Sequence, residues 1–98
     1  MQNRHERLRA ALTEAFHPTV LEIADESSLH AGHSGAAPGG ETHYRVLVVS
    51  AAFAAMTRVQ RSRAVHDAVA HELGTGLHAL SLTLRTPAEQ LSVNSSQK

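Results

Sequence analysis

Histidine is the residue type with which this chain could do chemistry. The 98 residues contain eight histidines and no cysteine. Without cysteine, the chain can form no disulfide, no zinc ribbon and no thiol nucleophile. Any metal it holds must be bound through imidazole or carboxylate groups, or through sulfur that another molecule supplies. The histidines are His5, His17, His30, His33, His43, His66, His71 and His78.

His78 stands where the third predicted strand begins, just after the glycines that end the preceding helix. The sequence supports two interpretations of it. It has the same strand parity as Leu80, Leu82 and Leu84, so its ring could be buried and satisfied by a backbone group. At the start of a strand, one ring nitrogen could instead stay open to bind a ligand.

A second group of imidazoles lies in the glycine-rich segment Glu26–Gly40, where no regular structure is expected. His30 and His33 are three residues apart near its centre. Two histidines at this spacing fit either a solvated loop or a loop that becomes ordered when it binds a metal. Two histidines alone are a weak metal signal, because zinc sites need further ligands at fixed spacing, but long loops without secondary structure are usually functional or disordered.

Arg58, Arg61 and Arg63 form a basic cluster near the second long predicted helix. They are candidates for contact with nucleic acid or a partner protein, and the alternative is a solvated or fold-stabilising role. Three arginines neutralise few phosphates, so any DNA affinity should be weak and should depend on salt. Aromatic residues are 3% of the chain, which leaves almost no stacking surface for single strands.

The sequence contains no arrangement typical of catalysis. Asp25 and Glu26 are adjacent, and neighbouring residues of a strand point to opposite faces. They therefore cannot act as a facing acid and base. No Ser–His–Asp spacing and no phosphate-cradling loop stands out, so we expect the chain not to be an enzyme.

Length and composition indicate one small domain, expected over residues 1–91, with a disordered polar tail over residues 92–98. Nine basic and nine acidic residues give zero net charge, whereas nucleic-acid-binding domains usually have a pI above about 9. No apolar run reaches the roughly 18–20 residues of a membrane span, and the N-terminal residues lack the apolar centre of a secretory signal. We expect a cytoplasmic protein without membrane contact, monomeric or weakly dimeric when alone.

Hydrophobic periodicity predicts the element order α-β-β-α-β-α. The expected helices span residues 4–16 and 60–73, with a turn or two after Thr86, and the expected strands span residues 19–25, 41–50 and 77–84. Asn3 and Thr86 are suitable N-caps, Pro18 should end the first helix, and one helical turn is expected around Phe53.

This order predicts the topology of the sheet. The first two strands are consecutive and should pair antiparallel. The third strand follows a helical crossover and should lie parallel to the second. Both long helices then cover one face of a three-stranded mixed sheet, which is an α+β sandwich.

Several separated motifs, in this order, resemble the BolA family over about residues 4–90. They are Leu21–Glu26, Gly40–Ser50, Phe53, Val59, Arg61, Arg63, Val65 and Gly76–Leu82. The resemblance implies one BolA-like domain with an α-β-β-α-β(-α) fold, similar to a type II KH domain. Two positions depart from the family pattern. Ser62 replaces the usual histidine between two arginines, and Ala55 replaces a usual glycine.

The resemblance also implies a function. BolA-like proteins pair with monothiol glutaredoxins in iron–sulfur and iron handling, so the implied cofactor is a [2Fe–2S] cluster shared with that partner and not bound by the chain alone. His78 and a loop histidine, His30 or the nearby His33, match the family's metal-binding positions. Some members are described as DNA-binding transcriptional regulators. That alternative would use the KH-like helix region after Arg58.

Overall fold

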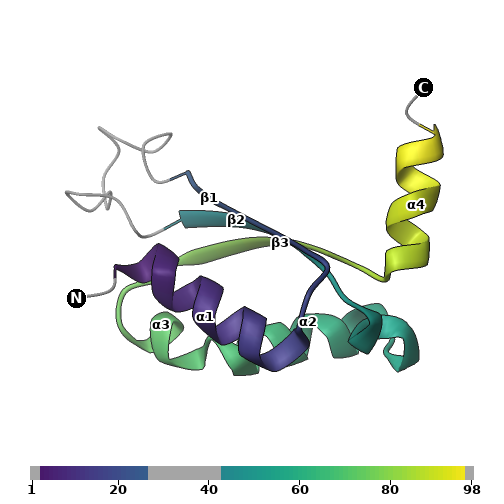
Figure 1. Ribbon diagram of the computed structural model, residues 1–98. Coiled ribbons are helices and arrows are strands. Elements are labelled where there is room, and N and C mark those ends of the chain that lie inside the picture. Colours follow the sequence, from purple (N-terminus) through teal and green to yellow (C-terminus); the bar gives the residue numbers. More distant parts are fainter. Residues whose placement is uncertain (1–2, 27–42, 97–98) are drawn as a thin grey trace.

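A three-stranded sheet with helices packed on one face forms the fold (Figure 1). The computed structural model describes residues 3–26 and 43–96. The elements are α1 (Arg4–Phe16), β1 (Val20–Asp25), β2 (His43–Val49), the 3-10 helix η2 (Ala51–Ala55), α2 (Arg58–Ala68), α3 (Ala70–Gly74), β3 (Ala79–Arg85) and α4 (Pro87–Ser96). The predicted α+β class and element order are confirmed.

The strands pair as the sequence predicts, in the order β1-β2-β3. β1 runs antiparallel to β2, with Leu21 opposite Val48. β2 runs parallel to β3, with Val46 opposite Leu82. Because β2 is the central strand, its end is apolar on both faces, and both Val48 and Val49 are buried.

The helices lie mainly on one side of the sheet. Figure 1 shows α1, α2 and α3 on the same face, whereas α4 extends from the end of β3 away from them. The predicted cover of one face by both long helices is therefore confirmed.

Helix α1 begins and ends where its capping residues predict. The backbone N–H of Glu6 donates to Oδ1 of Asn3 at 2.9 Å, which satisfies one free donor of the first turn. At the other end, His17 adopts the left-handed conformation with φ 46°, and Pro18 follows. Leu8 and Leu12 recur at helical spacing between these ends and are almost fully buried.

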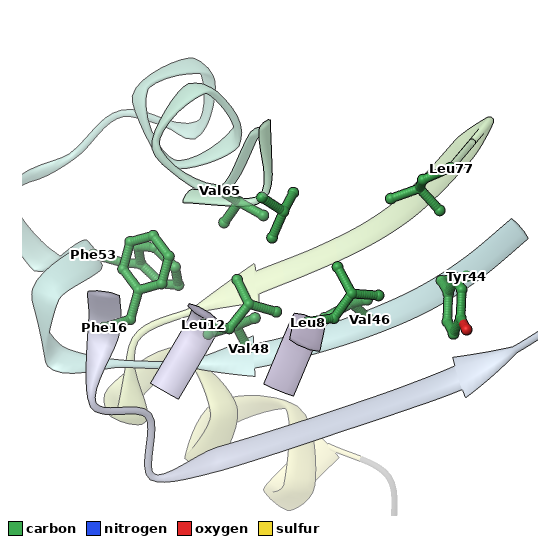
Figure 2. Close-up of a cluster of buried hydrophobic side chains, with 10 residues drawn as sticks. Leu8, Leu12, Phe16, Tyr44, Val46, Val48, Phe53, Val65 and Leu77 are labelled. Atoms are coloured by element: carbon green, nitrogen blue, oxygen red, sulfur yellow. The ribbon is translucent and has the colours of Figure 1, made fainter. Parts of the chain in front are cut away.

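The hydrophobic core fills the space between α1, α2 and the sheet (Figure 2). Its buried side chains are Leu8, Leu12, Phe16, Tyr44, Val46, Val48, Phe53, Val65, Val69 and Leu77. Phe53, on the predicted turn that forms η2, has no exposed area, and its ring centre lies 5.1 Å from that of Phe16. The alternate residues of β2 that face this core leave His43 and Arg45 on the opposite side of the strand.

The second long helix differs from its prediction. It begins at Arg58 rather than near residue 60, because Thr57 and Gln60 form a capping box with bonds of 2.8 and 3.2 Å. It also does not continue to residue 73. At Val69 the backbone leaves helical geometry, with φ −111° and ψ 20°, and α3 is a separate short helix.

The C-terminal part also differs from expectation. Thr86 caps α4 as predicted, since its Oγ1 accepts from the backbone N–H of Glu89 at 3.1 Å. The helix is longer than the expected turn or two and runs to Ser96, so the expected disordered tail is wrong for residues 92–96. Contacts along the helix support this length: Gln90 receives a bond from Arg85 at 2.9 Å and donates to Asn94 at 3.4 Å.

Candidate functional site

His78 lies at one end of the sheet and is exposed to solvent. The predicted strand over residues 77–84 instead begins at Ala79, so His78 precedes β3 and does not take the inward position that its parity suggested. Leu77 is the buried residue at this point, with 3% of its surface exposed. Of the two interpretations from sequence, the buried core histidine is therefore excluded, and a solvent-facing imidazole remains.

A second imidazole lies beside His78. Parallel strands begin at the same edge of a sheet, and the register places His43, the first residue of β2, opposite Ala79. The ring centres of His43 and His78 are 6.0 Å apart, and the rings are nearly perpendicular at 86°. The structure thus brings together two histidines that are far apart in the sequence.

His43 was not among the candidate residues derived from the sequence. A signal was nevertheless present, because His43 stands near the start of a predicted strand that should lie parallel to the strand in which His78 was predicted. The sequence did not predict the register between the two strands, because that register depends on how strands from distant parts of the chain pair.

The two loop candidates, His30 and His33, lie outside the described residues. The ends of the chain segment that contains them are described. β1 ends at Asp25 and β2 begins at His43, and the Glu26 backbone N–H donates to the His43 carbonyl at 2.8 Å. Both ends of this connection therefore lie at the same end of the sheet as His43 and His78, where β1 ends and where β2 and β3 begin.

The remaining described histidines do not join this pair. His5 lies at the start of α1, with Nε2 3.3 Å from the carbonyl oxygen of Ile23. His66 is exposed on α2, with Nδ1 2.8 Å from the carbonyl oxygen of Ser62. Across residues 3–26 and 43–96, no three histidine or carboxylate side chains are grouped closely enough to hold a metal ion.

Arg61 is a buried residue that stabilises the fold. It is 8% exposed, and its guanidinium donates to Glu89 at 2.7 and 3.2 Å and to the Leu84 carbonyl at 3.2 Å. It also lies over the ring of Phe53, 5.8 Å from the ring centre. The fold-stabilising alternative considered for the arginine cluster therefore describes Arg61.

Arg58 and Arg63, the other two members of that cluster, are exposed on α2. Arg58 lines a hollow of about 430 Å³ together with Leu84 at the end of β3 and Val93 of α4. This hollow lies at the opposite end of β3 from His78. The structure does not bring the candidate metal ligands and the candidate arginines into one site.

The carboxyl group of Glu89 has a lowered pKa. Its carboxylate accepts the bonds from Arg61 and one from the backbone N–H of Thr86 at 2.8 Å. The Arg61 hydrogen bond is the largest cause, and the Thr86 bond the next, that lower the pKa of Glu89 from its usual 4.5 to about 2. The carboxylate therefore stays ionised and neutralises Arg61 at any physiological pH.

No helix in the described part of the chain is both long and apolar enough to cross a membrane.

Comparisons with known proteins agree with the fold and the motifs. The family model for BolA-like protein matches residues 12–89. BolA-like protein 1 of Homo sapiens is 49% identical over 82 residues, which cover 84% of this chain and 57% of the human protein. The chain thus spans little more than half the length of that relative.

Solved structures give the same result. BolA1 from Arabidopsis thaliana superposes with a TM-score of 0.81 at 43% identity, covering 91% of this chain and 97% of that one. The BolA domain of SufE1 from the same plant superposes with a TM-score of 0.79 at 42% identity, covering 91% and 98%. By family model, sequence identity and fold, the chain belongs to the BolA family.

Proposed function

We propose that this chain is a non-enzymatic partner of a monothiol glutaredoxin and that the two proteins together bind or relay a [2Fe–2S] cluster. The observation that carries the proposal is the exposed imidazole of His78 at an edge of the sheet. Membership of the BolA family supports it. The second ligand from this chain would be His30 or His33, whose segment begins and ends at the same edge.

The donor set of this chain fits a shared cluster. A [2Fe–2S] cluster is held by four ligands, usually thiolates, and imidazoles can replace thiolates on one of the two irons. The chain has no cysteine, so the sulfur ligands must come from the partner and its bound thiol. What the chain offers is the imidazole of His78, which is exposed directly before β3, where a partner can reach it.

The test is to reconstitute the cluster anaerobically in a mixture of the full chain with a monothiol glutaredoxin, and to record its absorbance and circular dichroism. His78→Ala should change both spectra, because another group must replace the imidazole on one iron. The fold should remain intact, since substitutions at exposed positions usually change stability by no more than about 0.5 kcal/mol. Far-ultraviolet circular dichroism and a thermal unfolding curve check this.

His66→Ala is the matched control, because His66 is an exposed histidine on α2, away from the sheet edge. It should leave the spectra of the mixed complex unchanged. If His78→Ala gives a folded protein whose mixed-complex spectra equal those of the wild type, His78 is not a ligand and the proposal is wrong. The double change His30→Ala/His33→Ala should alter the spectra more than either single change.

A further inference from the structure

We infer that His43 and His78 form a two-imidazole site for one divalent transition-metal ion, in this chain without any partner. The inference goes beyond the proposed function because it assigns a role to His43 and needs neither glutaredoxin nor cluster. It shares only His78 with that proposal, so the two can fail separately.

The separation of the rings permits a shared ion. A metal bonded to an imidazole nitrogen at roughly 2.0–2.1 Å lies about 3.2 Å from the centre of that ring. Two rings that bind one ion in a tetrahedral arrangement therefore have their centres about 5.2 Å apart. The centres of His43 and His78 are 6.0 Å apart, so the two rings need to approach each other by only about 0.8 Å to share an ion.

The two residues differ in how firmly the fold holds them. His43 is half-buried and belongs to the central strand β2, which pairs with β1 on one side and β3 on the other. His78 is exposed and precedes the first residue of β3. The perpendicular rings can therefore turn toward a common point by rotation of the His78 side chain between staggered rotamers, while His43 stays in place.

The donors determine which ions the site should take. Two neutral imidazoles suit Zn²⁺, Ni²⁺ and Cu²⁺, whereas Mg²⁺ and Ca²⁺ require oxygen ligands. No third histidine or carboxylate in the described ranges completes a cluster with the pair. Two ligands leave further positions of a four-coordinate ion open, so the pair resembles an open zinc site rather than a closed structural one.

A different interpretation of the same geometry is simple ring packing. Perpendicular rings with centres 4.5–7 Å apart are a common aromatic arrangement, worth roughly 0.5–1.5 kcal/mol. The two interpretations differ over the ring nitrogens, which a metal requires and packing does not. A phenylalanine at position 43 keeps a ring of similar size and removes the nitrogens, so it separates them.

The experiment is a titration of the full-length chain with Zn²⁺ at neutral pH, followed by calorimetry and by NMR of the imidazole nitrogens. The nitrogen signals of His43 and His78 should shift together as one equivalent binds. Chelation by two linked groups usually exceeds binding by one group by roughly 10²–10⁴-fold. His43→Ala, His43→Phe and His78→Ala should therefore each weaken binding by at least about tenfold, and the double variant His43→Ala/His78→Ala should be little weaker than either single variant.

Two controls complete the design. His66→Ala should leave the Zn²⁺ affinity unchanged, and Mg²⁺ in place of Zn²⁺ should give no shift of the two rings. The inference is overturned if His78 responds to Zn²⁺ while the His43 nitrogens do not, or if His43→Phe keeps wild-type affinity. Because no glutaredoxin is present, either result would leave the proposed cluster function standing, and a failure of the cluster experiment would leave this site untouched.

Discussion

At the scale of single residues, the partly exposed Glu89 neutralises the charge of the buried Arg61. Arg61 is a buried cation, and burial of a charge is costly unless it is paired. The Glu89 carboxylate supplies that pairing at 2.7 Å, although about half of its side chain is exposed. Protonation of one surface residue therefore leaves a charge unpaired in the interior, next to the Phe53 ring.

This pairing predicts an acid-sensitive contribution to stability. The pKa of Glu89 is lowered from the usual 4.5 to about 2 by the Arg61 and Thr86 bonds, so the unfolded chain binds its proton more readily than the folded chain. The stabilisation is fully present above pH 4.5 and is lost as the pH falls toward 2. Urea unfolding between pH 2 and 6 should show a steeper loss of stability for the wild type than for Glu89→Gln. Parallel curves would contradict the prediction.

His43 marks the limit of what residue types alone can predict for the site. The position of His78 at the start of a strand was recognised from the sequence, since a helix-ending glycine pair precedes it. Its exposure and its neighbour were not, because both depend on the exact first residue of β3 and on the parallel register with β2. A shift of one residue in that register would separate the rings.

At the scale of elements, a buried ion cluster ties α1 to α3. Glu72 is 4% exposed, and its carboxylate accepts bonds from Arg4 at 2.8 Å and from Arg7 at 3.0 Å. Arg4 also donates to the carbonyl oxygens of Glu72 and Thr75, both at 3.0 Å. These contacts join the first turn of α1 to α3 and to Thr75, at the end of the helical crossover that leads into β3.

Removal of this carboxylate should be strongly destabilising. Glu72→Ala leaves the buried guanidinium of Arg4 without its counter-charge, and breaking a buried pair in this way typically costs about 3–5 kcal/mol. Glu14→Ala is the control, because Glu14 is exposed on α1, and surface substitutions usually stay within about 0.5 kcal/mol. Chemical unfolding of both variants gives the measurement. Equal stabilities would mean that the cluster contributes nothing.

Helices and strands could be predicted from the sequence where capping residues and apolar periodicity mark their ends. The predicted bounds were wrong at the start of α2, where a capping signal was present in the sequence, and at the break after α2, where the sequence carries no such signal. α1 was predicted over its full length because Asn3 and Pro18 bracket an apolar stripe. The start of α2 was missed although Thr57 and Gln60 form a capping box. The break at Val69 has no comparable sequence signal, since valine occurs in helices, and here its side chain is buried in the core.

At the scale of the whole molecule, the charges are balanced and dispersed. The net charge is zero, and the most buried member of the arginine cluster is neutralised within the fold by Glu89. Arg58 and Arg63 remain exposed on α2. Two arginines offer few phosphate contacts, and sequence-independent affinity for DNA depends on the number of such contacts.

We therefore expect the isolated chain to bind DNA only weakly and without sequence preference. Specific DNA-binding proteins have dissociation constants of about 10⁻⁸–10⁻¹¹ M at physiological salt. Fluorescence anisotropy with random and palindromic duplexes should give no constant in that range. The variant Arg58→Ala/Arg63→Ala should weaken the residual binding and reduce its salt dependence. A nanomolar, sequence-specific constant would overturn the prediction and support the regulator alternative.

The register of β2 with β3 links the two histidine rings to the completion of the fold. His43 and His78 meet only after β3 has docked on β2, because the pairing of His43 with Ala79 sets their distance. In the unfolded chain the rings are separated by the whole helical crossover. A ligand that holds both rings therefore binds the folded state alone, and at a hundred times its dissociation constant it adds about 2.7 kcal/mol to the free energy of unfolding. Such a ligand would raise the melting temperature as its concentration rises, and it would hold β3 against β2.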